Sequence, residues 1–508
     1  MSTPTRFIIL IFSPIPIIIG YIVDFLKRKG ITAVVDENLL YLVTHMYSVA
    51  TGKPPHERIF SLGSVSGRGY GEYSQVLSKI ASLGKKWGYG YVIATKIQSK
   101  ETTNTIFKDF LNRLAEAINV GEDLETFLNL EQSTILVTYE ADYTRVLEAI
   151  KLLLGIYTAS ISSAMFIVIN IVLLSFFIGN VMTIIVSFLG TIAALTILVF
   201  LIRKSLPRQI LVHDLSINIP EIMVYKFSLV ASIAMSSIVS FSIIAKLGEL
   251  SYTLIIFGFF LLVPGLIGRR IESNVKSIES FFIVFIRSLG LTYSTLRNYA
   301  QSIRSILASD LGLLTKHLRR LYSRLRNGIE TKVAFLYFIG ETGSETVRRG
   351  IDIFYDAIEA GGDPAKIGET LSITIQRTLN LRKQREQVAR AFQGVIYVLN
   401  TLIVALAEFV FTLTLMLQNV FVTAGGTGVH ILPFTFIEPI IIQILKVGLV
   451  FIITILNAFA LQFARGGYIG AAWLHASILL ILSGSTMIVA SIFSQALYKM
   501  LQIPQLAP

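Results

Sequence analysis

Seven apolar stretches, each long enough to cross a lipid bilayer, constrain this chain more than any other feature. A helix needs about 20 mostly apolar residues to span the hydrocarbon core. Glycine or polar breaks such as Gly179–Asn180 and Gly466–Gly467 separate neighbouring stretches, which is typical of tight turns at a membrane surface. The sequence therefore predicts an all-α, polytopic membrane protein. The stretches are Leu152–Ile178, Val181–Ile202, Phe227–Ala245, Leu250–Gly268, Ala391–Gln418, Ile440–Phe463 and Ala471–Phe493.

An eighth apolar segment, Phe7–Val23, is shorter and contains Pro14 and Pro16. Arg6 precedes it, as in a secretory signal peptide, but no small-residue cleavage site follows. We interpret it as a retained first span, with a signal peptide and an interfacial helix as the alternatives. The expectation is about eight transmembrane helices.

Two long polar blocks, Asp24–Lys151 and Arg269–Arg390, interrupt the apolar pattern. Charged residues make up 15% of the chain, against about a quarter in a typical globular protein, and most of them lie in these blocks. The first block is electrically neutral, whereas the second has 20 basic and 12 acidic residues. Because the positive-inside rule acts on short loops, we interpret this excess as a surface property of the second block.

Charge in the short connections predicts the orientation. The connection Arg203–Lys226 carries four basic residues, whereas Gly179–Asn180 and Asn419–Pro439 carry none, so the first should be cytoplasmic. Even numbers of spans separate it from both polar blocks, which are then cytoplasmic too. The predicted order is a first span (7–23), a cytoplasmic helical domain (24–151), four spans (152–268), a basic cytoplasmic helical domain (269–390), three spans (391–493) and an extracytoplasmic tail (494–508).

The two polar blocks contain an internal repeat. Leu111–Asp123 aligns with Ile351–Asp363 at an offset of 240 residues, and Glu37–Leu40 resembles Glu279–Phe282 at an offset of 242. Each matched segment reads as a helix that ends at a glycine, followed by an aspartate that caps the next helix. Each block is therefore predicted to be a small helical bundle, and turn building alone explains the residue types at Gly121, Asp123, Gly361 and Asp363.

Motifs for catalysis and cofactor binding are absent from the sequence. The chain has no cysteine, which excludes disulfides, zinc–thiolate sites and a thiol nucleophile. Neither Gly52-Lys53 nor Gly84-Lys85 has the spacing of a phosphate-binding loop. The six histidines show no metal-ligand spacing, and no serine-hydrolase motif occurs. The sequence predicts no enzyme activity, no cofactor and no metal.

Two charged residues, Glu408 and Lys446, lie at membrane depth. Charges in a bilayer are costly and often functional. By helix rise, both side chains lie at similar depth, so they are predicted to form an intramembrane ion pair. The alternative is a proton or ion site of a secondary transporter.

Two clusters of basic residues stand out in the second block. One lies on the amphipathic segment Leu311–Asn327, where docking to an acidic partner is our interpretation and a solvated face is the alternative. Nucleic acid is not expected, because aromatic residues are not interleaved with these cations. The other leads into a span and is predicted to contact anionic lipid or a partner. The clusters are Lys316, Arg319, Arg320, Arg324 and Arg326, and Arg377, Arg382, Lys383, Arg385 and Arg390.

The tandem helical blocks, each with an Ala-Ile-x-x-Gly-x-Asp turn and each followed by spans, resemble the F-domain family of type II secretion and type IV pilus systems. The resemblance covers Leu39–Leu130 and Phe281–Leu371. Bacterial members are similar but have about three spans. The additional spans look like the archaeal branch, which includes the platforms of the archaellum and of adhesive pili.

This resemblance implies a non-catalytic membrane platform. Such platforms dock a hexameric secretion ATPase from the cytoplasm and pass its motion to pilin- or archaellin-like subunits in the membrane. The resemblance also implies a homodimer, and the ATPase contact is expected in the basic domain. A membrane scaffold unrelated to filaments is the further alternative.

Overall fold

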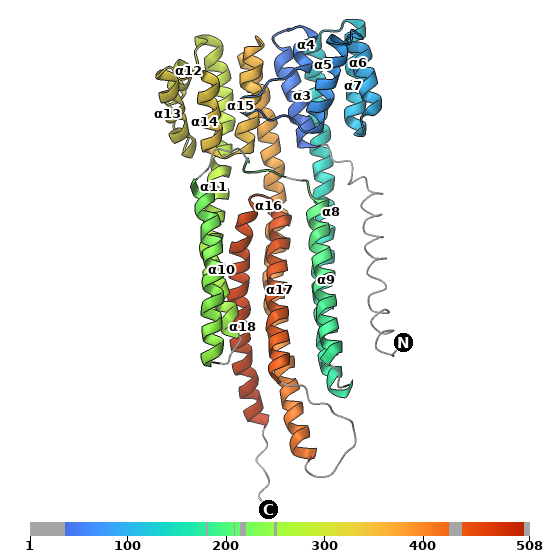
Figure 1. The fold of residues 1–508 in the computed structure, drawn as a ribbon, viewed down its shortest axis with the longest axis vertical. Helices are drawn as coiled ribbons and strands as arrows, with labels where there is room; N and C mark the ends of the chain where they lie inside the picture. The colour runs from blue at the N-terminus through green and yellow to red at the C-terminus, as the bar shows by residue number, and fades with distance from the viewer. Residues whose placement is uncertain are drawn as a thin grey trace, which may run out of the picture.

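The computed structural model describes residues 36–178, 181–207, 209–213, 220–247, 251–425 and 439–501. Within these ranges the regular secondary structure is helical, apart from one isolated bridge between Val212 and Ser344. Two helical bundles lie side by side at one end of the molecule, and long helices extend from them to the other end (Figure 1). The all-α fold predicted from the sequence is confirmed.

The first bundle surrounds α3 (Glu37–Ala50), whose side chains from Leu39 to Ala50 are all buried. A helix buried on every side needs apolar residues on every face, and this one has them. It packs against the N-terminal part of α8 (Leu124–Ile178) and against the second bundle. The other helices of this bundle are α4 (His56–Phe60), α5 (Glu72–Lys85), α6 (Gly90–Glu101) and α7 (Thr105–Val120).

The second bundle is built from the same succession of helices. It begins with the C-terminal part of α11 (Ser251–Leu296) and ends with the start of α16 (Pro364–Gly425). Its short helices are α12 (Tyr299–Ile306), α13 (Leu313–Arg326), α14 (Thr331–Thr342) and α15 (Glu345–Glu359).

The internal repeat extends over the whole bundle. The first residues of α5 and α13, α6 and α14, α7 and α15, and α8 and α16 differ by 240 or 241 in number. Gly71 and Gly312 precede α5 and α13 with φ of 64° and 53°. Gly121 and Gly361 follow α7 and α15 with φ of 77° and 85°. Only glycine adopts such backbone angles without strain, so the same turns recur in both copies.

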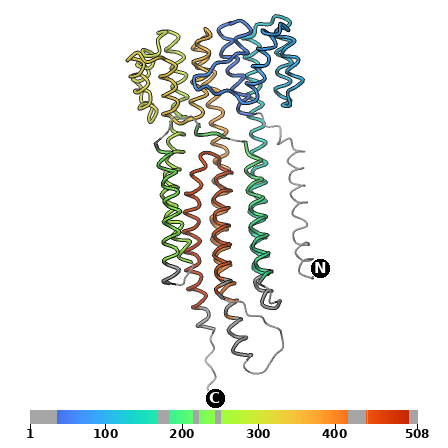
Figure 2. The backbone as a smooth tube through the Cα atoms, in the orientation of Figure 1, coloured from blue at the N-terminus to red at the C-terminus, as the bar shows by residue number. Residues whose placement is uncertain are grey.

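Three helices continue from the bundles into the apolar part without a break (Figure 2). They are α8, α11 and α16, and α16 alone has 62 residues, about 93 Å at 1.5 Å per residue. The sequence-based domain boundaries at 151, 268 and 390 therefore fall inside continuous helices. The N-terminal parts of α8 and α16 pack together, and Gln132 Nε2 donates to Thr374 Oγ1 at 3.0 Å.

Seven helices in the described residues are long and apolar enough to span a membrane, and each contains most of one predicted stretch. Their number matches the seven spans predicted from the sequence. Phe7–Val23 lies outside the described residues, and residues 494–501 extend the last helix instead of starting the predicted tail. The remaining apolar helices are α9 (Val181–Ser205), α10 (Pro220–Leu247), α17 (Pro439–Arg465) and α18 (Ala472–Leu501), with the short 3-10 helix η1 (Ile469–Ala471) before α18.

Small residues let α11 and α18 approach closely. A Cβ atom on Gly265 would lie 2.5 Å from the backbone nitrogen of Leu474, and one on Gly268 would lie 2.5 Å from the carbonyl oxygen of Gly470. Ser477 Oγ donates to the Gly258 carbonyl at 2.6 Å. Such contacts hold helices together where lipid removes the hydrophobic drive for association.

Candidate partner-docking site

Helix α13 carries the first basic cluster. Leu314, Leu318 and Leu321 recur at helical spacing and are buried, which turns the intervening cations outward. Four of the five predicted docking residues are exposed, and Arg324 is partly buried. The exposed residues are Lys316, Arg319, Arg320 and Arg326.

Glu341 on α14 lies close to two cations of this cluster, Arg320 and Arg324. It forms an ion pair with Arg324 and lies 3.7 Å from Arg320, and the Arg324 guanidinium stacks on the Tyr337 ring at 5.1 Å. Burial lowers the pKa of His317, whose ring lies 3.9 Å from Glu341. Arg324 therefore holds α13 against α14 and, unlike Lys316, Arg319 and Arg326, has a carboxylate partner among the described residues.

Three cations of the cluster remain available. Among the described residues, Lys316, Arg319 and Arg326 form no ion pair. Because unpaired surface cations keep their full attraction for an approaching anion, these three residues form the electropositive face of α13.

The second basic cluster, on α16, differs from the sequence-based interpretation. Arg385 is buried and only 11% of the Arg382 side chain is exposed, so neither presents a surface for lipid or a partner. Arg377 forms an exposed ion pair with Glu140 at 3.2 Å. Lys383 and Arg390 are exposed and remain candidates for such a contact.

Arg382 joins the two bundles. Its guanidinium donates to Glu37 at 2.8 Å and lies 3.4 Å from Glu279. Glu37 begins α3 of the first bundle, whereas Glu279 lies on α11 of the second. These are the two glutamates that the sequence repeat aligns, so one arginine neutralises both copies of a repeated carboxylate. Since all three groups are largely buried, the cluster is a clamp between the bundles.

Arg385 fastens two connections of the membrane part to α16. It donates to the carbonyl oxygens of Phe463 and Ala464 at 2.6 and 2.9 Å, and to that of Pro207 at 3.2 Å. The first two carbonyls belong to the last turn of α17, which leaves such groups without helical partners. The sequence held one signal of this role, because Leu381, Arg385 and Ala389 share one buried face of α16.

The sequence analysis missed a polar cluster at the bundle interface. Asp356 on α15 binds His45 Nε2 at 2.9 Å and also pairs with Arg58. The backbone N–H of Gly63 donates to the same carboxylate at 2.9 Å. Burial alone would raise the pKa of Asp356, but these hydrogen bonds outweigh it and lower the pKa to about 2. No local motif marks this cluster, because its partners lie about 300 residues apart.

Asparagine at position 356 is expected to remove a pH-dependent part of the stability. A lowered pKa stabilises the fold above the ordinary carboxyl value, and this stability is lost as pH falls from about 4 towards 2. The shift corresponds to about 2 kcal/mol. The free energy of unfolding of the detergent-solubilised chain should therefore be lower for Asp356→Asn than for wild type, and this difference should shrink as pH falls over this range. Asp109→Asn, at an exposed position of α7, should show no such gap, and a pH-independent gap for Asp356→Asn would contradict the assignment.

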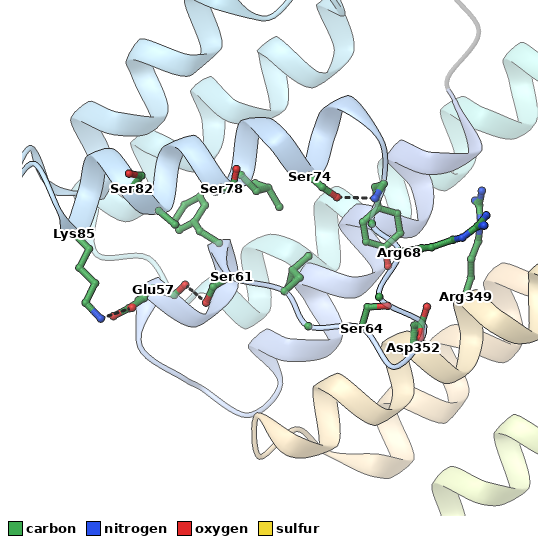
Figure 3. Close-up of a pocket in the computed structure, with 18 of the residues that line it drawn as sticks. Glu57, Ser61, Ser64, Arg68, Ser74, Ser78, Ser82, Lys85, Arg349 and Asp352 are labelled. Atoms are coloured by element: carbon green, nitrogen blue, oxygen red, sulfur yellow. Dashed lines mark hydrogen bonds and ion pairs between the residues drawn. The ribbon is translucent and has the colours of Figure 1, made fainter. Parts of the chain in front are cut away.

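A cavity of about 840 Å³ lies between α5, the connection before it and α15. Figure 3 shows Lys85 and Glu57 at one end, and Arg349 and Asp352 at the other. Lys85, at one end of the cavity, lies 2.6 Å from Glu57, and the buried Arg349, at the other end, lies 2.9 Å from Glu345. Five cations and two carboxylates line the cavity, so its lining is net basic.

In the membrane part, Lys446 Nζ lies 2.6 Å from Glu408 Oε2, and both side chains are buried. The ammonium also lies 3.8 Å from the centre of the Phe411 ring. The two residues come from α17 and α16, so the pair holds these helices together. Its enclosure by protein leaves the charges neutralised within the bundle of spans.

A chain of buried hydrogen bonds connects four of the long helices. Tyr157 of α8 donates to Asn457 of α17 at 2.9 Å, and Asn457 donates to Asn400 of α16 at 3.0 Å. Asn400 then donates to Ser483 of α18 at 2.8 Å. Such bonds between helices fix their relative register in lipid.

Both repeated turns are stabilised by hydrogen bonds, and the second turn also contacts the first bundle. Asp123 accepts from Thr126 within its own turn, at an exposed position. At the equivalent turn, Thr51 of the first bundle accepts from the Asp363 backbone N–H at 3.0 Å. A Cβ atom on Gly52 would lie 2.7 Å from Gly361, so the two bundles meet backbone to backbone here.

These features define a polytopic, all-helical membrane protein whose repeated polar bundles are continuous with its spans. Residues 285–418 match the type II secretion system (T2SS) protein F family. The match covers the second bundle and the span that follows it. The structural repeat places a second copy of the bundle in the first polar block, outside the matched range.

Two curated relatives extend the similarity along most of the chain. Flagella accessory protein J of Methanocaldococcus jannaschii is 27% identical over 458 residues, which are 87% of this chain and 81% of that protein. The protein of the same name from Methanococcus voltae is 23% identical over 482 residues, 92% of this chain and 86% of that protein. No solved structure matches the chain.

Proposed function

We propose that this chain is the membrane platform on which an archaeal type IV pilus-like filament, such as an archaellum, is assembled. The T2SS protein F domain and the two flagella accessory proteins support this assignment. In this role the chain catalyses no reaction. It recruits a hexameric secretion ATPase from the cytoplasm and contacts pilin- or archaellin-like subunits in the membrane, as a homodimer embedded in lipid.

The observation that carries the proposal is the continuity of α8, α11 and α16. Each of these helices belongs to a polar bundle at one end and spans the membrane at the other. Because a continuous, packed helix transmits displacement along its axis, movement of a bundle moves the attached span. Arg385 holds α17 and the α9–α10 connection against α16, one of these three helices.

The ATPase docks on the electropositive face of α13 in this proposal. Lys316, Arg319 and Arg326 supply charge without a competing carboxylate among the described residues. A cationic face of this kind raises the rate of encounter with an acidic partner and fixes the approach direction. The bundles then lie in the cytoplasm, as the charge distribution of the short connections predicts.

Reversal of all three charges, as Lys316→Glu, Arg319→Glu and Arg326→Glu, is expected to weaken ATPase binding at least about tenfold at low salt. Screening of the interaction should shrink the difference from wild type as ionic strength rises. Binding is measured with the purified hexameric ATPase and the full chain in nanodiscs. All three side chains are exposed, so the fold should be retained.

Arg287→Glu with Arg304→Glu provides a control, because both residues are exposed cations of the same bundle on helices other than α13. This control should bind the ATPase nearly as well as wild type. Equal loss in both variants would indicate nonspecific attraction, and unchanged binding in the triple variant would remove the α13 assignment.

A further inference from the structure

The repeat allows α6 and α14 to be compared position by position at an offset of 240. Their buried positions coincide, as in the pairs Ala94 and Ala334, and Gln98 and Phe338. Some of the exposed positions coincide as well. At three equivalent exposed positions, two on each helix and one shortly before it, both copies carry apolar side chains that are 36–52% exposed. These are Tyr89, Ile93 and Ile97 in the first bundle and Ile329, Val333 and Tyr337 in the second.

We call each set an apolar row, because its members are four residues apart in sequence and the last two of each set lie on one side of a helix. Isolated apolar residues are common on protein surfaces and need no explanation. Here the residue types differ between the copies at all three positions, yet all six are large and apolar. On the buried side the copies diverge in polarity, with Gln98 opposite Phe338. Apolar character is thus retained in both copies at these exposed positions, although it is not retained at every buried position of the repeat.

Cations flank both rows. Lys96 and Lys100 are exposed on α6 beside the first row, and Lys332 is exposed on α14 beside the second. The Arg324 guanidinium lies on the Tyr337 ring, which joins the second row to the electropositive face of α13. Glu330 is the acidic neighbour of the second row. An apolar row four residues apart, with cations at its edges, complements the apolar face and acidic flanks of an amphipathic helix.

The two rows lie on different bundles. Figure 1 shows α6 in one bundle and α14 in the other, both at the end of the molecule remote from the tips of the spans. Two equivalent sites on one chain suit a partner that presents the same element more than once, as a ring of identical subunits does.

We propose that the two apolar rows are equivalent docking sites for one kind of acidic, amphipathic helix, which two subunits of the ring-shaped ATPase present together. This inference rests on the proposed function and deepens it. Engagement at two sites multiplies affinity through effective concentration, so loss of either site removes that gain. It also connects both bundles, and the long helices α8, α11 and α16 that continue from them, to one ATPase ring.

The test compares two double variants, Ile93→Glu with Ile97→Glu, and Val333→Glu with Tyr337→Glu. Each is expected to weaken binding of the purified hexameric ATPase to the full chain in nanodiscs by a similar factor of about ten or more, and the combination should weaken it further. Val120→Glu with Leu130→Glu, at exposed apolar positions outside both rows, should leave binding unchanged. Thermal unfolding of each variant reports that the bundles remain folded.

Three outcomes would overturn the inference in distinguishable ways. If wild type binds the ATPase and neither double variant alters binding, the rows are not docking sites and the proposed function stands. If only one double variant matters, the sites are not equivalent. If the variants instead change the oligomeric state of the chain alone, the rows are a contact between copies. Absence of ATPase binding by the wild type would remove both the inference and the proposed function.

Discussion

Alanine at position 382 is expected to lower the free energy of unfolding by about 3–5 kcal/mol, because it leaves two buried carboxylates without a cation. Arg382 is the shared partner of Glu37 and Glu279, one from each bundle. Without it, the two carboxylates repel each other across the interface, or one must take up a proton. The measurement is a denaturant titration of the detergent-solubilised chain, followed by circular dichroism.

Two further variants show whether the loss of stability comes from breaking the Arg382 clamp or from removing any arginine of α16. Arg377→Ala removes the exposed pair with Glu140 and should cost less than about 1 kcal/mol. Arg382→Met combined with Glu37→Gln and Glu279→Gln removes the orphaned charges and should recover most of the stability. Similar losses for Arg382→Ala and Arg377→Ala would show that the bundles do not depend on this clamp.

Alanine at position 446 is expected to have an effect of similar size within the membrane part. Lys446 lies 2.6 Å from Glu408 in a buried pair, and its removal leaves an unpaired carboxylate among apolar helices. The expected loss is about 3–5 kcal/mol, measured by the same titration. The damage should be local to the contact between α16 and α17, where the pair lies.

Replacement of both charges by leucine distinguishes a structural pair from a transport site. Glu408→Leu with Lys446→Leu restores a neutral, apolar contact and should be nearly as stable as wild type. If the pair is structural, cells with this variant should still assemble filaments. Stable protein with no filaments and with lost proton or ion flux would instead favour the secondary transporter interpretation.

The basic residues of α16 show where sequence patterns reach their limit. Five cations before a span predicted a contact with lipid or a partner, yet Arg382 and Arg385 lie on the buried side of the helix and bind groups far away in the chain. Helical spacing assigns these two arginines to the same face as Leu381 and Ala389, but it cannot reveal which carboxylates and carbonyls meet them. On α13 the same spacing placed four of five cations correctly at the surface, because leucines at regular intervals fixed the buried side.

By itself, the sequence determined the spans, the helical class, the duplicated turn and the charge difference between the blocks, because each depends on residues close together in the chain. The tertiary structure decided which charges are free. Glu341 withdraws Arg324 from the α13 face, and Arg382 joins two glutamates 242 residues apart. It also showed that the repeat preserves two exposed apolar rows. Ion pairing and exposure depend on contacts between helices distant in sequence, and only the folded chain brings those helices together.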